Sequence, residues 1–298
     1  MTLVLDEAEW RSRQATHEAR VDAWVQPHLW RRSRGERHPV EDFLFTYYSY
    51  RPARLRRWGP GVGVRLTGAA TEFGAATGYA VCADGSAMVD CRAAGRRRTT
   101  IEWIRDLLVS TAQRPPMLGC FGLHEWAMTY RLSTQERRHP AYPLRLGARG
   151  TDQVVERHRI TCTHYDAFRF FTDDARPRNS VAPSRDTQQA HEQPGCLHAA
   201  MDCYKYAYKL APFGASELVA DCFELARDVR AVDMAASPYD LSSLGIEPIR
   251  IETSAGKAAY IAQQRAFAPR TARLRERLVD VCDAVLGPMD PEQAATRG

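Results

Sequence analysis

Helical spacing of apolar residues dominates the pattern along this chain. Between Ser216 and Ala235 apolar side chains recur every three or four residues, at Leu218, Cys222, Leu225, Val229 and Val232. Similar spacing predicts helices over residues 6–30, 99–112, 120–132, 196–210 and 254–286. The first begins with a candidate capping box, Asp6 with Glu9, and Pro269 should interrupt the last. The pattern therefore predicts a mainly α-helical protein.

Two stretches depart from helical spacing. Residues 59–98 hold eight of the 19 glycines, and the segment Tyr79–Asp90 is typical of a small β-hairpin turning at Asp84-Gly85. The side-chain types of residues 158–171 alternate with a period of two, which favours a β-strand. A strand would place His164 and Asp166 on the same face.

We expect one helical domain over residues 1–286, with the Gly-rich β insertion at 59–98. The polar segment 172–195 carries three prolines and is predicted to be a flexible loop, and residues 287–298 should form a frayed tail. No run of 18 apolar residues predicts a membrane span, and the acidic N-terminus lacks signal-peptide features, so we expect a cytoplasmic protein with no membrane partner.

Composition refines this picture only modestly. Hydrophobic residues make up 44% of the 298 residues and charged residues 26%, as in globular proteins. The net charge of +5 arises mostly from arginine, which is compatible with nucleic acid as a partner. Eight cysteines occur without a Cys-x-x-Cys pair, which favours reduced, partly buried thiols over a zinc knuckle.

Aromatic and basic residues gather between His38 and Trp58. Rings stack on bases and guanidinium groups pair with phosphates, so this stretch is a candidate nucleic-acid or substrate surface. The alternative is that the rings belong to the core and the arginines to a solvated edge. The candidate binding residues are Tyr47, Tyr48, Tyr50, Arg51, Arg57 and Trp58, together with Trp126 and Lys205.

Four short clusters each contain at least one acidic residue, and three of them also contain a histidine. They are His124-Glu125, His164-x-Asp166, His198-x3-Asp202, and the acidic stripe Asp221-x2-Glu224-x3-Asp228. One interpretation is structural: His198 and Asp202 form a satisfied buried pair, and the acidic stripe is a solvated helix face that pairs with Arg227 and Arg230.

A second interpretation is a metal site. Helices that face one another and contribute histidines and carboxylates hold iron, manganese or zinc in helical bundles. The candidate ligands are His124, His164, His198 and Asp202. The function would then be a metal-dependent oxidase or hydrolase acting on a small molecule, and the three histidines should converge in space.

A third interpretation is an N-glycosidase that requires no cofactor. Cleaving an alkylated purine from deoxyribose needs little acid catalysis, because the cationic base leaves as a neutral molecule. The enzyme must flip the base out, stack it between rings and place a carboxylate near the developing oxocarbenium ion. Candidate catalytic residues are Asp202, Glu224, Asp166, His164, His124 and Glu125. The rings of Tyr47 to Trp58 should then border a basic groove with a carboxylate at its floor.

Several segments point to a known family. GCFGLHEWAMTYR from Gly119, HYDAFRFFT from His164, CLHAAMDCYKYAYKL from Cys196, and the stretch from Val21 to Trp58 resemble an actinobacterial family whose members are labelled 3-methyladenine DNA glycosylases. The resemblance covers most of the chain except residues 59–98 and 172–195. It implies DNA as the partner, release of alkylated bases and a place in base excision repair. The leading prediction is therefore a DNA glycosylase-like N-glycosidase.

Overall fold

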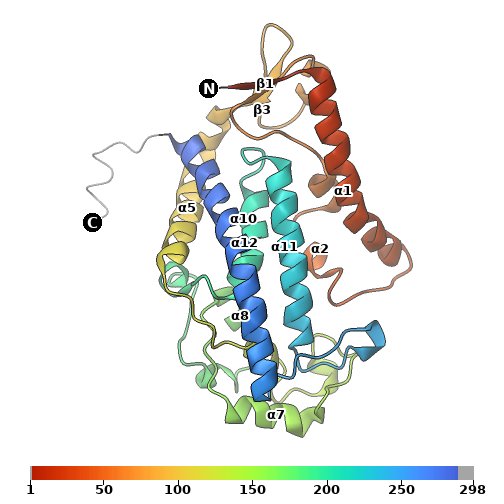
Figure 1. The fold of residues 1–298 in the computed structure, drawn as a ribbon, viewed down its shortest axis with the longest axis vertical. Helices are drawn as coiled ribbons and strands as arrows, with labels where there is room; N and C mark the ends of the chain where they lie inside the picture. Colours follow the sequence, from red (N-terminus) through yellow and green to blue (C-terminus); the bar gives the residue numbers. More distant parts are fainter. Residues whose placement is uncertain (1, 288–298) are drawn as a thin grey trace, which may run out of the picture.

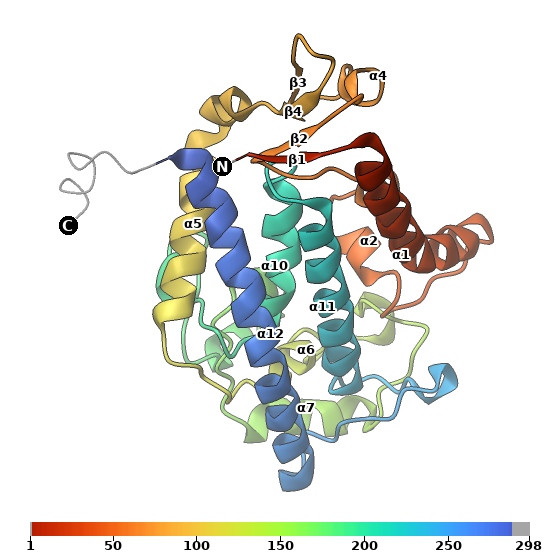
Figure 2. The same ribbon diagram turned by 45° about the horizontal axis from the view of Figure 1, so that its top comes forward.

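A bundle of four long helices forms the centre of the molecule. The computed structural model describes residues 2–287, and the bundle comprises α5 (Arg98–Gln113), α10 (Leu197–Lys209), α11 (Ser216–Ala235) and α12 (Ser254–Leu286). Figures 1 and 2 show α10 between α11 and α12, with α5 on the outer side of α12. Their facing apolar stripes form one large hydrophobic core. The prediction of a mainly α-helical protein is confirmed.

A small sheet covers one end of this bundle (Figure 2). Its strands are β1 (Leu3–Leu5), β2 (Val64–Leu66), β3 (Tyr79–Val81) and β4 (Ala87–Val89), in the order β1-β2-β4-β3. The β1–β2 pair is parallel and the other pairs are antiparallel. The β3–β4 hairpin confirms the prediction, and Gly85 takes the positive φ of 76° that its turn requires. Three-residue β1 and β2 are too short to show alternation in the sequence.

The first helix joins the sheet to the bundle. Helix α1 (Glu7–Ser33) begins with the predicted capping box, in which Asp6 and Glu9 bond to each other's backbone N–H groups. Trp10 on α1 stacks on Trp58 at 6.4 Å and meets the edge of Phe73 at 6.0 Å. These rings fill a second, smaller core beneath the sheet.

Shorter helices complete the structure. They are α2 (Phe43–Tyr47), α3 (Pro52–Arg56), α4 (Ala70–Phe73), α6 (Leu123–Ala127), α7 (Gly147–Arg157), α8 (Tyr165–Phe168) and α9 (Gln188–His191). Short 3-10 helices span Cys91–Arg97, Thr134–Glu136, Arg176–Arg178 and Ser242–Leu244. Within residues 2–287, no helix combines the length and apolar character that crossing a membrane demands.

Three predicted elements are corrected by the structure. Residues 158–171 form no strand beyond a single bridge at Ile160, because His164 instead caps α8 by accepting the N–H of Ala167. The helix predicted over 120–132 is only α6, since the chain enters it through Gly122 at a φ of 72°. Helix α12 continues through Pro269, where packing against α5, α10 and α11 offsets the missing hydrogen bond.

The segment 172–195, which we expected to be a flexible loop, is tied to the interior. The side chain of Asn179 accepts the N–H of Cys162 at 2.8 Å. Gln188 on α9 donates to Glu192 at 2.9 Å and lies 3.2 Å from the hydroxyl of Tyr206 on α10. The predicted tail at 287–298, apart from Gly287, lies outside the described residues.

Gly256 in the first turn of α12 provides a test of this packing. Alanine normally favours a helix over glycine by about 1 kcal/mol, but a Cβ at this position would collide with the backbone oxygen of Arg250. We expect Gly256→Ala to lower the free energy of unfolding by about 1–3 kcal/mol in denaturant titrations. Gly95→Ala is the control, because no atom lies within 4 Å of its Cβ position. Equal stability of the two variants would contradict this close approach.

Candidate functional site

One face of α10 carries polar side chains from the protein interior to a surface pocket. His198, Asp202, Lys205 and Lys209 follow one another at helical spacing, as the sequence predicts. Lys205 and Lys209 line the pocket, whereas Asp202 is 1% exposed and His198 is 9% exposed. This face therefore carries polar side chains at two depths, in the interior and at the pocket.

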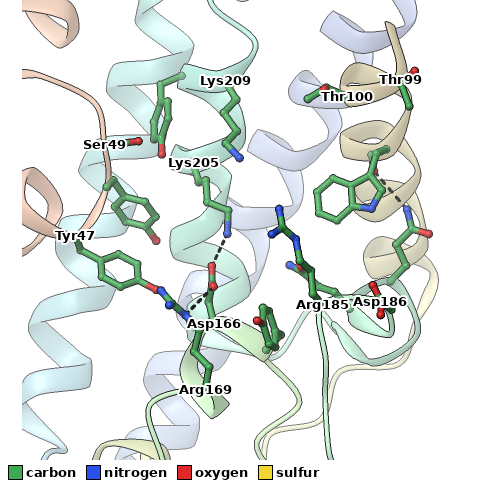
Figure 3. Close-up of a pocket in the computed structure, with 16 residues that line it drawn as sticks. Tyr47, Ser49, Thr99, Thr100, Asp166, Arg169, Arg185, Asp186, Lys205 and Lys209 are labelled. Carbon is green, nitrogen blue, oxygen red and sulfur yellow. Dashed lines mark hydrogen bonds and ion pairs between the residues drawn. The ribbon is translucent and has the colours of Figure 1, made fainter. Parts of the chain in front are cut away.

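The pocket has a volume of about 980 Å³ and is rich in cations and aromatic rings (Figure 3). The loop after α2, the first turns of α5, the region of α8, residues 185–189 and α10 contribute to its walls. Lys205, Lys209 and Arg185 point into it. Its charged lining residues are Arg169, Arg185, Lys205, Lys209, Asp166 and Asp186.

A buried ionic network forms the floor of this pocket. The ammonium of Lys205 lies 2.8 Å from Asp166 and 2.5 Å from Asp202. Arg169 lies 3.2 Å from the other oxygen of Asp166. Asp202 also accepts hydrogen bonds from Tyr48 at 2.9 Å and from His164 at 3.2 Å. Asp202 thus lies on the interior side of the network and holds Lys205, Tyr48 and His164 together.

Charge pairing holds this network in its ionised state. Burial acts to raise the pKa of Asp202, but Lys205 and His164 bring it well below its ordinary value. Burial likewise acts to lower the pKa of Lys205, and the nearby charge of Asp202 raises it well above its ordinary value. Both groups therefore remain charged at neutral pH, as partners that satisfy each other.

The three candidate histidines converge behind the network, as predicted for a metal site. The ring centroids of His124 and His198 are 4.4 Å apart, and those of His164 and His198 are 5.3 Å apart. They come from α6, from the residue that caps α8, and from α10. Burial and the adjacent His124 lower the pKa of His198 well below its ordinary value, which keeps its imidazole neutral.

Asp233 on α11 is the residue of this region that sequence reasoning missed. Its Oδ1 lies 2.9 Å from Nε2 of His124, and its Oδ2 accepts a hydrogen bond from Arg230 at 3.0 Å. Arg230 also donates to Glu125 at 2.7 Å and is 1% exposed, so it does not belong to the expected solvated face. One signal was present: Asp233 lies four residues after Val229 and directly after Val232, so helical spacing places it beside the apolar stripe of α11.

Buried thiols adjoin the histidines. The Sγ of Cys120 lies 3.5 Å from Nδ1 of His124. A hydrogen bond from Cys162, together with His124, brings the pKa of the Cys120 thiol well below its ordinary value despite burial. Six of the eight cysteines are buried, which confirms the prediction that several thiols lie in the interior.

The acidic stripe on α11 lies at the surface, away from both groups. Glu224 pairs with Arg20 at 2.8 Å, and Asp221 pairs with Arg20 and Arg277, both at 2.7 Å. Asp228 pairs with a further arginine of α12. The structural interpretation of this stripe is therefore correct, although its partners are not those expected.

The candidate binding residues divide among several places. Tyr47 and Tyr48 line the pocket, whereas Tyr50, Arg57 and Trp58 line a second hollow of about 470 Å³. The Trp126 indole is fully buried and donates to the backbone oxygen of Ala236, so this ring belongs to the core. Arg51 lines a third hollow and neither of the first two.

The chain matches no protein-family model, no curated protein and no solved structure. Its resemblance to the glycosylase family therefore stays a prediction.

Asp202 provides a test of the buried network. Asp202→Ala would leave Lys205 with one carboxylate and the donors of Tyr48 and His164 without an acceptor. We expect it to lower the free energy of unfolding by about 3–5 kcal/mol, measured by denaturant titration. Glu224→Ala is the matched control, and should change stability by less than about 1 kcal/mol because its ion pair is exposed. Similar effects of the two variants would contradict the anchoring role of Asp202.

Proposed function

We propose that the protein binds nucleic acid across the pocket and acts as an N-glycosidase that releases alkylated bases of the 3-methyladenine type. The observation that carries this proposal is the composition of the pocket. Tyrosine and tryptophan rings and basic side chains surround a carboxylate on its floor, which is the arrangement that this chemistry requires.

The basic side chains extend beyond the pocket. Arg54, Arg57, Arg96 and Arg97 line the second hollow, which has no carboxylate among its lining residues. Tyr208 borders both hollows, so the two basic surfaces are neighbours. Within the described residues, Arg57, Arg185 and Lys209 form no ion pair with a carboxylate. A phosphate backbone that follows this path would meet these three cations, which pair with no carboxylate of the described residues.

Partly exposed aromatic rings in the pocket could stack on a base that has been flipped out of the DNA duplex. Trp103 is 37% exposed, and Tyr47 and Tyr165 are partly exposed on other walls of the same pocket. The quadrupole of such rings attracts a positively charged base more strongly than a neutral one. Stacking of this kind contributes about 1–3 kcal/mol per base, and the positive charge of an alkylated purine adds selectivity.

Asp166 is the carboxylate in position to act on the sugar. It borders the pocket, and Lys205 and Arg169 fix its two oxygens. A negative charge there would stabilise the oxocarbenium ion as the neutral base departs, so no strong general acid is needed. Asp202, whose oxygens are occupied by Tyr48, Lys205 and His164, positions Lys205 instead. His124 and Glu125 contact Asp233 and Arg230 and have no part in this step.

Binding to DNA should depend strongly on salt. We expect duplex affinity to fall linearly with the logarithm of salt concentration, and Arg57→Ala and Arg185→Ala each to reduce that slope by about 1. Fluorescence anisotropy with a labelled duplex measures both quantities. Arg277→Ala is the control, because this arginine pairs with Asp221 on another surface. Salt-independent binding, or an equal effect of all three variants, would contradict the proposed path.

Base release tests the catalytic assignment directly. We expect the protein to liberate 3-methyladenine from methylated DNA, and Asp166→Asn to slow the rate by about 100- to 1,000-fold without loss of DNA affinity. Chromatography of the released base gives the rate, and Glu224→Gln serves as the control. If the natural protein releases no base, or if Asp166→Asn is fully active, the proposed reaction is wrong.

A further inference from the structure

We propose that His124, His198 and Asp233 form a binding site for one divalent transition-metal ion. The proposal is independent of the N-glycosidase proposal, because these residues take no part in the pocket chemistry. One ligand atom from each residue lies within 4.8 Å of the other two. The residues come from α6, α10 and α11, so the site joins three helices that are distant in the sequence.

The potential ligand atoms lack other partners. Nε2 of His124 and Oδ1 of Asp233 are buried and are 2.9 Å apart, yet neither makes a hydrogen bond, because they are not aligned for one. The ring of His198 makes no hydrogen bond with any residue between 2 and 287. Unsatisfied polar atoms are costly in a protein interior. Two such atoms, those of His124 and Asp233, lie beside the ring of His198 and point to a bound cation at this place.

The second polar atoms of His124 and Asp233 contact outer partners, as in known metal sites. Oδ2 of Asp233 accepts from Arg230, which Glu125 orients in turn. Nδ1 of His124 faces the Cys120 sulfur at 3.5 Å, which leaves Nε2 for an ion. Such outer contacts fix the orientation of metal ligands and strengthen their binding.

The neighbouring group His164, Glu192 and Asp202 is equally compact but is already satisfied. Nδ1 of His164 accepts the N–H of Ala167, so Nε2 carries the proton that is donated to Asp202. Glu192 accepts from Gln188. His164 thus has no lone pair to offer an ion. The proposed ligand set differs from the one expected from the sequence, because it contains Asp233 and leaves out His164 and Asp202.

The chemistry of the three ligands limits which metal ions the site would bind. Two imidazoles and one carboxylate are a set that binds iron(II) or zinc, with the remaining coordination positions open to water or substrate. Ligand atoms at about 2.0–2.2 Å from one ion lie roughly 3–4 Å apart, so the observed spacing requires only small side-chain adjustments. A bound ion would also supply the Lewis acid that a metal-dependent oxidase or hydrolase, the alternative function, requires.

The competing explanation is a buried ion pair between protonated His124 and Asp233. Burial acts to lower the pKa of His124, but the adjacent Asp233 raises it well above its ordinary value. A stable pair of this kind should have a well-aligned hydrogen bond. It also gives no role to His198, whose ring lies edge-on to His124. The ion pair alone therefore accounts for less of the geometry than a metal site does.

Metal analysis of the full chain, purified without chelator or a metal-binding tag, is the decisive experiment. We expect about one iron, manganese or zinc ion per chain. Chelator-treated protein should bind one equivalent of Co²⁺, with a visible absorption band typical of nitrogen and oxygen ligands. If the purified protein contains no metal and an excess of Co²⁺ produces no saturable band, the site is the ion pair alone and the proposal is wrong.

Variants test which residues hold the ion. His198→Ala and Asp233→Asn should each reduce the Co²⁺ affinity by at least tenfold, whereas His164→Gln should leave it within about threefold. Circular dichroism confirms that each variant is folded, and the titration of the natural protein decides the proposal if one is not. Loss of binding in His164→Gln but not in His198→Ala would place the ion in the other group and overturn the assignment. Base release by the metal-free protein, measured separately, tests only the N-glycosidase proposal.

Discussion

The burial of charge along α10 is the constraint on which the rest of the structure depends. Asp202 is 1% exposed and the Lys205 side chain is 15% exposed on a helix that packs against two others, and either charge would be strongly destabilising alone. Their burial is possible because Tyr48, His164 and Asp166 provide the remaining hydrogen bonds and charge. The stretch around α2 and the segment that caps α8 must therefore approach α10 closely. This requirement shapes the pocket wall and brings the histidines together.

The central helices follow from the sequence because their own periodicity determines them. Helix α11 begins and ends where its apolar stripe predicts, and α10 differs from its prediction by one residue at each end. The polar face of α10 also follows from spacing alone, so Lys205, Asp202 and His198 were correctly placed on one side. Local patterns suffice wherever the helix itself sets which residues are neighbours.

The features that the sequence did not predict depend on contacts between residues that are distant in the chain. His164 looked like a strand residue, but its ring caps a short helix and bonds to Asp202, which is 38 residues away. Residues 172–195 are polar and rich in proline, yet they pack against the core, where Gln188 bonds to Tyr206 on α10. The role of Asp233 depends on His124, a residue of another helix. No spacing rule within one segment reports such partners.

The order of residues along α10 also determines how far apart the two proposed sites lie. His198 precedes Lys205 by seven residues, which at 1.5 Å per residue separates them by about 10 Å along the axis. Asp202 and His164 lie between them and bond to each other, so they form a polar layer behind the pocket floor. A base held in the pocket would therefore not touch an ion bound by His124, His198 and Asp233. Such an ion would act on a ligand that arrives by another route, or would join α6, α10 and α11 behind the floor that supports Asp166.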